Sequence, residues 1–156
     1  EKEHYTDCKA DMVIYDQPGK VLSNLGVTRG VAVCGEDGLD EITLTGETDV
    51  HEIRFGEITS YTITPEQFGL SRCPLADLIG GTPEENAQIT MDILTGKETG
   101  AKRDVVLMNA GMALYLGIDG ITLAEGVEKT KELIESGAAL KKYEEFREAT
   151  KAVAAK

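Results

Sequence analysis

Residues 31–41 read VAVCGEDGLDE, and this stretch restricts the fold more than any other part of the sequence. The apolar run at its start is typical of a short buried strand, and the glycines that follow allow the backbone to turn. Four carboxylates then fall within six residues, at Glu36, Asp37, Asp40 and Glu41. Because ligands in open α/β sheets gather beyond the carboxyl ends of strands, this acidic turn is a candidate site for a hard cation.

Asp40 and Glu41 are the candidate metal ligands within this turn. On a regular strand their side chains would point to opposite faces, so they can act together only on irregular backbone, which Gly38 permits. The alternative is an acidic surface turn, in which Asp37 and Gly38 form an ordinary β-turn. Local chemistry alone favours that alternative, because short acidic turns are common and their motif specificity is weak.

The residues around the acidic turn predict a mixed α/β fold. Residues 20–25 have helical spacing and end at Gly26, which places a helix before the strand at 31–34. Residues 42–63 are rich in Thr, Val and Ile and predict short strands separated at Gly46 and Gly56. A strand could also run through residues 12–15, in the least readable part of the chain.

From Thr82 onward the sequence predicts helices. Thr82 and Thr122 are each followed three positions later by Glu, which is the capping-box pattern of a helix start. The predicted helices run from Thr82 to about Leu94, from about 103 to 116 as a buried helix, from Thr122 to Gly137, and from Ala138 to the carboxyl terminus. No repeat or linker interrupts this order, so we expect one domain over residues 1–156.

The composition is typical of a soluble globular domain. The 156 residues are 41% hydrophobic and 28% charged, which is enough chain to bury a sizeable core without a disulfide or structural metal. A net charge of −12 argues against a nucleic-acid surface, which needs clustered Lys and Arg. No apolar run approaches the roughly 20 residues of a membrane span, so we expect no membrane partner.

Cysteine and histidine usage adds no recognisable site. Cys8, Cys34 and Cys73 are irregularly spaced, so neither a disulfide framework nor a zinc site is predicted, and a reducing cytoplasm is the simplest location. His4 and His51 lie far apart in the sequence and predict no metal or catalytic pair.

Two other polar positions have a structural and a functional interpretation. Gly80 and Gly81 could present backbone amides to an anion, but a capped helix start is favoured because Glu84 and Glu85 already complement the helix dipole. Asn109 lies in an apolar helix and could reach a ligand, but a hydrogen bond to neighbouring backbone is the favoured interpretation.

An ordered series of motifs resembles the anthranilate phosphoribosyltransferase family. In chain order it comprises VLSNLGV at 21–27, GEDGLDEI at 35–42, ITPEQFGL at 63–70, GG at 80–81, ENA at 85–87, NA at 109–110 and EGV at 125–127. The resemblance covers nearly everything from about Lys20 to Phe146, and the order of the motifs is specific where GLDE alone would be modest support. Because of this resemblance, a metal site becomes the favoured interpretation of Asp40 and Glu41, in place of an acidic surface turn.

The resemblance implies an activity and a fold. The family transfers phosphoribose from phosphoribosyl pyrophosphate to anthranilate in tryptophan biosynthesis. Its members have a small helical domain, through which they usually dimerise, and a larger α/β domain with a central sheet flanked by helices, similar to class II pyrimidine nucleoside phosphorylases. This chain would be the carboxyl-terminal part of the larger domain, with a helical carboxyl-terminal region.

The resemblance also implies the role of the acidic pair. Asp40 and Glu41 would bind Mg²⁺ held against the substrate's pyrophosphate. Magnesium commonly uses one or two carboxylates together with substrate phosphates, so it would allow an acidic protein to hold an anionic ligand. Bound there, it would neutralise the charge that builds on the departing pyrophosphate.

The sequence departs from the family in several places. The family's glycine-rich GTGGD loop, its KHGN segment and the arginine associated with anthranilate have no counterpart here. The resemblance therefore implies that this chain alone is inactive and lacks the helical domain. Family members often have His where this chain has Cys34, and residues 1–19 do not match the family, so no role is transferred to them. The chain starts at Glu1 and not at Met, which suggests processing, engineering or a fragment.

Two other functions stay open at this point. A fragment of a related pyrimidine nucleoside phosphorylase would share the fold, but its substrate loops would differ from GTGGD and KHGN in the upstream half. A non-catalytic binding module, or a subunit of a split enzyme completed by another polypeptide, would also retain the fold. A gene start immediately before Glu1 would favour this last function, whereas continuous upstream coding sequence would favour truncation.

Overall fold

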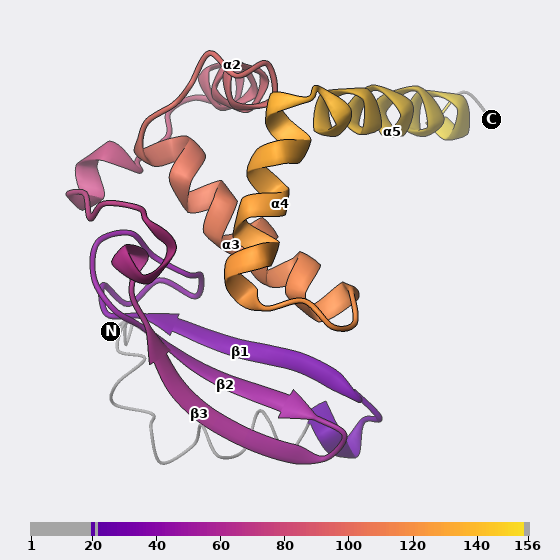
Figure 1. The fold of residues 1–156 in the computed structure, drawn as a ribbon. Coiled ribbons are helices and arrows are strands. Elements are labelled where there is room, and N and C mark those ends of the chain that lie inside the picture. The colour runs from indigo at the N-terminus through magenta and orange to yellow at the C-terminus, as the bar shows by residue number, and fades with distance from the viewer. Residues whose placement is uncertain (1–19, 21, 155–156) are drawn as a thin grey trace, which may run out of the picture. The chain divides into compact units, whose positions relative to one another are not determined.

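The computed structural model describes residue 20 and residues 22–154, which form two compact units (Figure 1). One unit comprises the described residues up to Leu75 together with Leu116–Gly120. The other comprises Ala76–Tyr115 and the described residues from Ile121 onward. The strand considered at 12–15 lies outside the described residues. A single domain over residues 1–156 stays a prediction, because two compact units can belong to one domain.

The first unit is built on a three-stranded antiparallel sheet in the order β1-β2-β3. The strands are β1 (Arg29–Gly35), β2 (Thr48–Arg54) and β3 (Glu57–Ile63). The strand predicted at 31–34 is confirmed, but its residues are half-buried and not fully buried as expected. The strands predicted within 42–63 are confirmed from Thr48 onward, whereas residues 42–47 form a loop.

Successive strands run antiparallel because the segments that connect them contain no helix that could form a parallel crossover. Phe55 and Gly56 join β2 to β3, and their φ angles of 51° and 89° are the two positive values that a tight two-residue hairpin requires. Residues 36–47 join β1 to β2 without a helix, whereas parallel strands usually need a helical crossover. The sheet is therefore antiparallel and differs from the open α/β sheet in which we placed the acidic turn.

The buried residues of the first unit come from β2 and from the segment just before it. Val50 and Ile53 on β2 are 0% exposed, as is Leu44 in the preceding loop. Ile42 is also buried, at 1% exposed. Burying one such aliphatic side chain contributes about 1.5–3 kcal/mol, so the end of the β1–β2 loop is firmly anchored in the unit.

Helices follow the sheet, as predicted, and the chain is of mixed α/β type with a helical carboxyl-terminal region. Two short 3-10 turns, η1 (Pro65–Phe68) and η2 (Leu75–Asp77), precede the longer helices. These are α2 (Pro83–Leu94), α3 (Ala101–Gly117), α4 (Leu123–Glu135) and α5 (Ala138–Ala154). Upstream of β1, residues 20 and 22–24 are also helical. Among the described residues, no helix is long and apolar enough to span a membrane.

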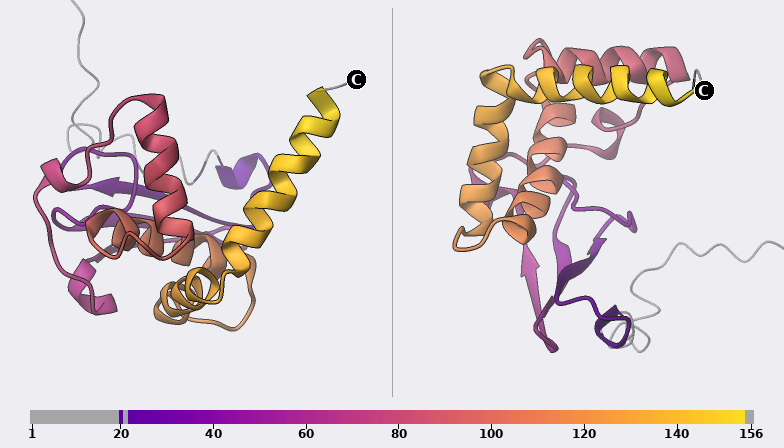
Figure 2. Two further views of the ribbon diagram at one scale, coloured as in Figure 1. Left: turned by 90° about the horizontal axis from the view of Figure 1, so that it is seen from above. Right: turned by 90° about the vertical axis from the view of Figure 1, so that its right-hand side faces the viewer.

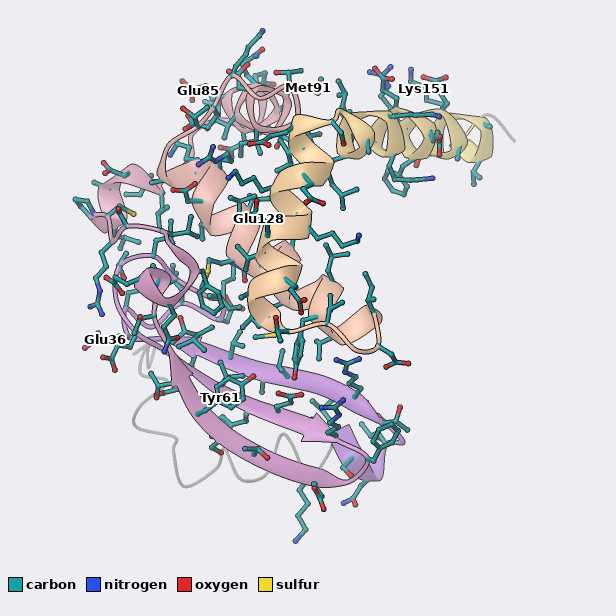
Figure 3. All side chains as sticks on the ribbon, in the orientation of Figure 1. Glu36, Tyr61, Glu85, Met91, Glu128 and Lys151 are labelled. Carbon is teal, nitrogen blue, oxygen red and sulfur yellow. The ribbon has the colours of Figure 1, made fainter. Side chains whose placement is uncertain are left out.

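Both predicted capping boxes are present. At the start of α2, where Figure 3 labels Glu85, the Glu85 carboxylate accepts the Thr82 N–H at 2.7 Å and the Thr82 hydroxyl accepts the Glu85 N–H at 3.3 Å. Thr122 and Glu125 repeat the arrangement at the start of α4, with distances of 2.7 and 3.2 Å. Local sequence therefore determines where these helices begin.

Two glycines bring the backbones of α3 and α4 into contact in the second unit. The helices lie side by side in each view (Figure 1 and Figure 2). A Cβ added to Gly126 on α4 would overlap the backbone oxygen of Gly111 on α3. A Cβ added to Gly111 would lie 2.8 Å from the backbone nitrogen of Val127. No side chain fits between the helices at this crossing.

We expect Gly126→Ala to lower the free energy of unfolding by roughly 1–3 kcal/mol or more, because the new methyl group meets backbone that cannot rotate away. Urea unfolding of wild-type and variant protein measures this difference. Gly117→Ala is the matched control, because a Cβ at Gly117 meets no atom within 4 Å. Alanine is the better helix former, so the control should be neutral or slightly stabilising. If Gly126→Ala and Gly117→Ala were equally stable, the close contact between the backbones of α3 and α4 would be contradicted.

Candidate functional site

The acidic turn is a loop, residues 36–47, that leaves the carboxyl end of β1 and returns to β2. Its base is closed: Gly35 pairs with Thr48, and the Glu36 N–H donates to the Glu47 oxygen at 2.8 Å. Figure 3 labels Glu36 at this end of the sheet. The loop therefore follows the carboxyl end of a strand, as predicted, although the sheet is antiparallel.

Asp37 organises the interior of the loop. One carboxylate oxygen accepts the Thr43 hydroxyl at 2.5 Å and the Thr45 hydroxyl at 2.7 Å. The other accepts the Leu39 N–H at 3.1 Å. Because Thr43 is only 1% exposed, this carboxylate connects the exposed turn to the buried end of the loop.

The same contacts shift the protonation equilibrium of Asp37. Partial burial by itself raises the pKa of this carboxyl, but hydrogen bonds from Thr43, Thr45 and the Leu39 N–H stabilise the charged form and outweigh it. The net effect is a pKa below the ordinary value of 3.8. Asp37 is therefore ionised at neutral pH and acts only as an acceptor.

This shift predicts an acid-dependent loss of stability. A lowered pKa in the folded state stabilises the protein above the ordinary value of 3.8, and this contribution disappears as the pH falls through the folded-state pKa. We therefore expect wild type to be more stable than Asp37→Asn at about pH 6, and the difference to shrink by about pH 3, in urea unfolding. Other carboxyls titrate in both proteins and cancel in this comparison. A difference that stays constant with pH would contradict the role of the Asp37 charge.

Asp40 and Glu41 lie on the exposed bend of the loop. Gly38 has a φ of 85°, which supplies the irregular backbone that the pair was predicted to need. Both side chains are exposed, and neither forms a hydrogen bond or an ion pair within the described part of the chain. Residues 42–44, which follow directly, are at most 1% exposed. The pair is thus held at the surface by a segment that is itself buried.

Two exposed carboxylates without protein donors suit a magnesium ion that is shared with a substrate. Magnesium keeps several waters and is commonly bound by one or two carboxylates together with phosphate oxygens. Within residues 20 and 22–154, no group of three or more His, Cys, Asp and Glu side chains is arranged to hold a metal. The donor set therefore fits a cation completed by water and phosphate, and it does not fit an all-protein cage.

Gly80 and Gly81 are part of the capped start of α2 and not an anion site. The Asn86 side chain accepts the Gly81 N–H at 2.8 Å and donates to the Gly81 oxygen at 3.1 Å. A Cβ on Gly80 would overlap the Asn86 side-chain oxygen. The Gly81 amide is therefore already bonded, and the favoured interpretation, a capped helix start, is confirmed.

The remaining candidates also have local contacts. The Asn109 amide donates to the Val105 oxygen at 3.0 Å, which confirms the expected bond to neighbouring backbone. His51 lies on β2, where its Nδ1 is 2.7 Å from the Ser60 hydroxyl. Cys34 and Cys73 form no disulfide in the part of the chain that the structure describes. His4 and Cys8 lie outside the described residues.

Thr43 and Thr45 are the loop residues that sequence reasoning missed. They lie two residues apart in the loop before β2, and both hydroxyls donate to the same oxygen of the Asp37 carboxylate. Their spacing was visible in the sequence, but nothing there indicated which residue the hydroxyls would meet.

Comparison with known proteins matches most of the chain to one family. The model described as "Glycosyl transferase family, a/b domain" matches residues 12–140. An anthranilate phosphoribosyltransferase of Endomicrobium trichonymphae is 50% identical over 130 residues, which are 83% of this chain and 38% of that protein. One of Ruminiclostridium cellulolyticum is 46% identical over 129 residues, again 38% of its length. The chain thus spans well under half the length of these relatives.

Solved structures are similar over the same region. The crystal structure of anthranilate phosphoribosyltransferase from Thermus thermophilus superposes with a TM-score of 0.74 at 40% identity, over 83% of this chain and 37% of that one. The enzyme from Saccharomyces cerevisiae in complex with PRPP and Mg superposes with a TM-score of 0.73 at 30% identity, over 80% of this chain and 36% of that one.

Proposed function

The chain belongs to the glycosyl transferase family whose α/β-domain model it matches, and we propose that it is part of an anthranilate phosphoribosyltransferase. In the complete polypeptide, the reaction joins phosphoribose from phosphoribosyl pyrophosphate to the amine of anthranilate, in tryptophan biosynthesis. The relatives named above carry this enzyme's name, and one of them is described with PRPP and Mg. They support this assignment over a nucleoside phosphorylase.

One observation carries the proposal: the two carboxylates of Asp40 and Glu41 are exposed and without protein donors among the described residues, at the end of β1 and inside the matched region. We assign them as the residues that would hold Mg²⁺ together with the pyrophosphate of the substrate. Bound there, the ion supplies positive charge that stabilises the leaving group. The chain's own contribution is to expose both carboxylates on a loop whose end is buried.

The rest of the assignment concerns the complete polypeptide. We propose that these residues form the carboxyl-terminal part of an α/β domain with a central sheet flanked by helices, in a two-domain fold. The complete enzyme would dimerise through its helical domain, and we place it in the cytoplasm. The net charge of −12 on these 156 residues makes an anionic partner such as nucleic acid unfavourable for this part of the protein.

An assay of the complete natural polypeptide tests the function. Anthranilate is fluorescent, so its consumption can be followed directly. We expect consumption that requires both phosphoribosyl pyrophosphate and Mg²⁺. A protein that instead cleaves pyrimidine nucleosides with phosphate, or that has neither activity, would overturn the proposal.

A further inference from the structure

One carboxylate holds both sides of the segment that carries Asp40 and Glu41. An Asp37 oxygen accepts the N–H of Leu39, directly before the pair, at 3.1 Å. Its other oxygen accepts the hydroxyl of Thr43, one residue beyond Ile42, at 2.5 Å. The backbone from 39 to 43 is therefore tied to the same side chain at its two ends.

Further bonds restrict the loop on each side. Upstream, the Gly35 N–H donates to the Leu39 oxygen at 2.8 Å. Downstream, the Thr43 N–H donates to the Thr48 hydroxyl at 3.1 Å, and Thr45 adds its own hydroxyl to Asp37 at 2.7 Å. These contacts hold the backbone on both sides of the exposed bend that carries Asp40 and Glu41.

The packing at Gly35 shows how closely this arrangement is built. A Cβ at Gly35 would overlap the Asp37 Oδ1 atom and lie 3.1 Å from the Thr43 Cβ. Glycine at this position leaves room for the Asp37 oxygen that accepts the Leu39 N–H. The strand end and the loop interior therefore fit together as one unit.

Asp37 is distinguished from its acidic neighbours by its contacts. Three donors, from Leu39, Thr43 and Thr45, bond to its two carboxylate oxygens. By contrast, no donor in the described residues reaches Asp40 or Glu41. Its lowered pKa keeps Asp37 ionised and accepting at neutral pH. Asp37 is thus suited to hold the loop, and the other two carboxylates to meet a ligand.

We propose that Asp37, Thr43 and Thr45 form a positioning network that sets the orientation of Asp40 and Glu41 toward magnesium. This inference rests on the proposed function. A loop that is already held loses less conformational freedom when its side chains bind, so it binds more tightly than a free loop with the same carboxylates. Partners that orient metal ligands typically change metal affinity or activity by about 10–100-fold when removed.

The test compares Thr43→Val with Thr43→Ser in the complete polypeptide. Valine keeps the shape of threonine but removes the hydroxyl that Asp37 accepts, whereas serine keeps the hydroxyl and loses a methyl group. Neither substitution changes a charge, so direct electrostatic effects on the cation are avoided. Thr45→Val and Thr45→Ser repeat the comparison at a half-buried position, in case Thr43→Val does not fold.

Two measurements are expected to differ between the valine and the serine variants. The Mg²⁺ concentration for half-maximal turnover should rise on the order of 10-fold with valine and stay close to wild type with serine. Without magnesium or substrate, the Leu39 amide should exchange with deuterium faster with valine, because the carboxylate that accepts it has lost an anchor. If valine and serine behave alike in both readouts, the hydroxyl does not position the pair and the proposal is wrong.

The outcome can be told apart from failure of the proposed function. If wild-type protein shows no magnesium-dependent turnover of phosphoribosyl pyrophosphate and anthranilate, the proposed function fails and the positioning role fails with it. If wild type is active and the valine variants have its magnesium dependence, only the positioning role fails.

Discussion

Asp40→Asn or Glu41→Gln is expected to lower the turnover of the complete enzyme by about 100-fold or more, while its melting temperature changes little. Each substitution removes a ligand charge and nearly preserves the side-chain shape. Removing one interaction that stabilises developing charge commonly costs about 2.7–4 kcal/mol, which corresponds to this factor. Folding should tolerate the change, because both side chains are exposed and have no bonds within the described residues.

The size of this defect should depend on magnesium. A weakened site is refilled by mass action when the ion is abundant, so the defect should be largest at low Mg²⁺ and partly recover at high Mg²⁺. Turnover across a magnesium titration, with a thermal melt of each variant, measures both effects.

Glu47→Gln is the matched control, because Glu47 is an exposed carboxylate in the same loop whose side chain has no bond within the described residues. It should keep wild-type turnover. If Asp40→Asn and Glu41→Gln both kept wild-type kinetics, the metal-site assignment would be wrong and the acidic loop would be an ordinary surface turn.

The second large effect is expected from the isolated chain, which should not consume anthranilate at all. It spans 38% of the length of the relative from Endomicrobium trichonymphae, and the GTGGD and KHGN motifs that the resemblance places upstream are not in its sequence. Positioning two reactants contributes roughly 7–11 kcal/mol to catalysis, and most of the groups that would do this are not in these residues.

The measurement is anthranilate fluorescence with phosphoribosyl pyrophosphate and Mg²⁺, at equal concentrations of isolated chain and complete polypeptide. A cooperative thermal melt of the isolated chain must accompany it, so that lack of activity is not confused with lack of folding. Magnesium-dependent consumption by the purified isolated chain would refute this prediction.

Local features of the fold could be predicted from the sequence. The helix starts at Thr82 and Thr122 depend on bonds between residues three positions apart, and both are where their capping boxes placed them. The strand at 31–34 and the hairpin glycine at Gly56 likewise depend on neighbouring residues. For the same reason, the irregular backbone beneath Asp40 and Glu41 was predictable from Gly38.

Contacts between distant residues could not be predicted. The approach of Gly111 to Gly126 depends on how two helices pack, and nothing in the sequence indicates that either glycine forms a contact. The antiparallel sheet depends on which strands pair, which the apolar pattern of a single strand does not specify.

The candidate site illustrates the same division. The sequence by itself determined that an acidic pair follows a strand on an irregular turn, because residue type and order are sufficient for that. Only the tertiary structure decided that Asp37 turns inward to Thr43 and Thr45 while Asp40 and Glu41 stay exposed. The four carboxylates of the turn are chemically alike. Their roles differ because the buried end of the loop contacts only some of them when the loop folds back against β1.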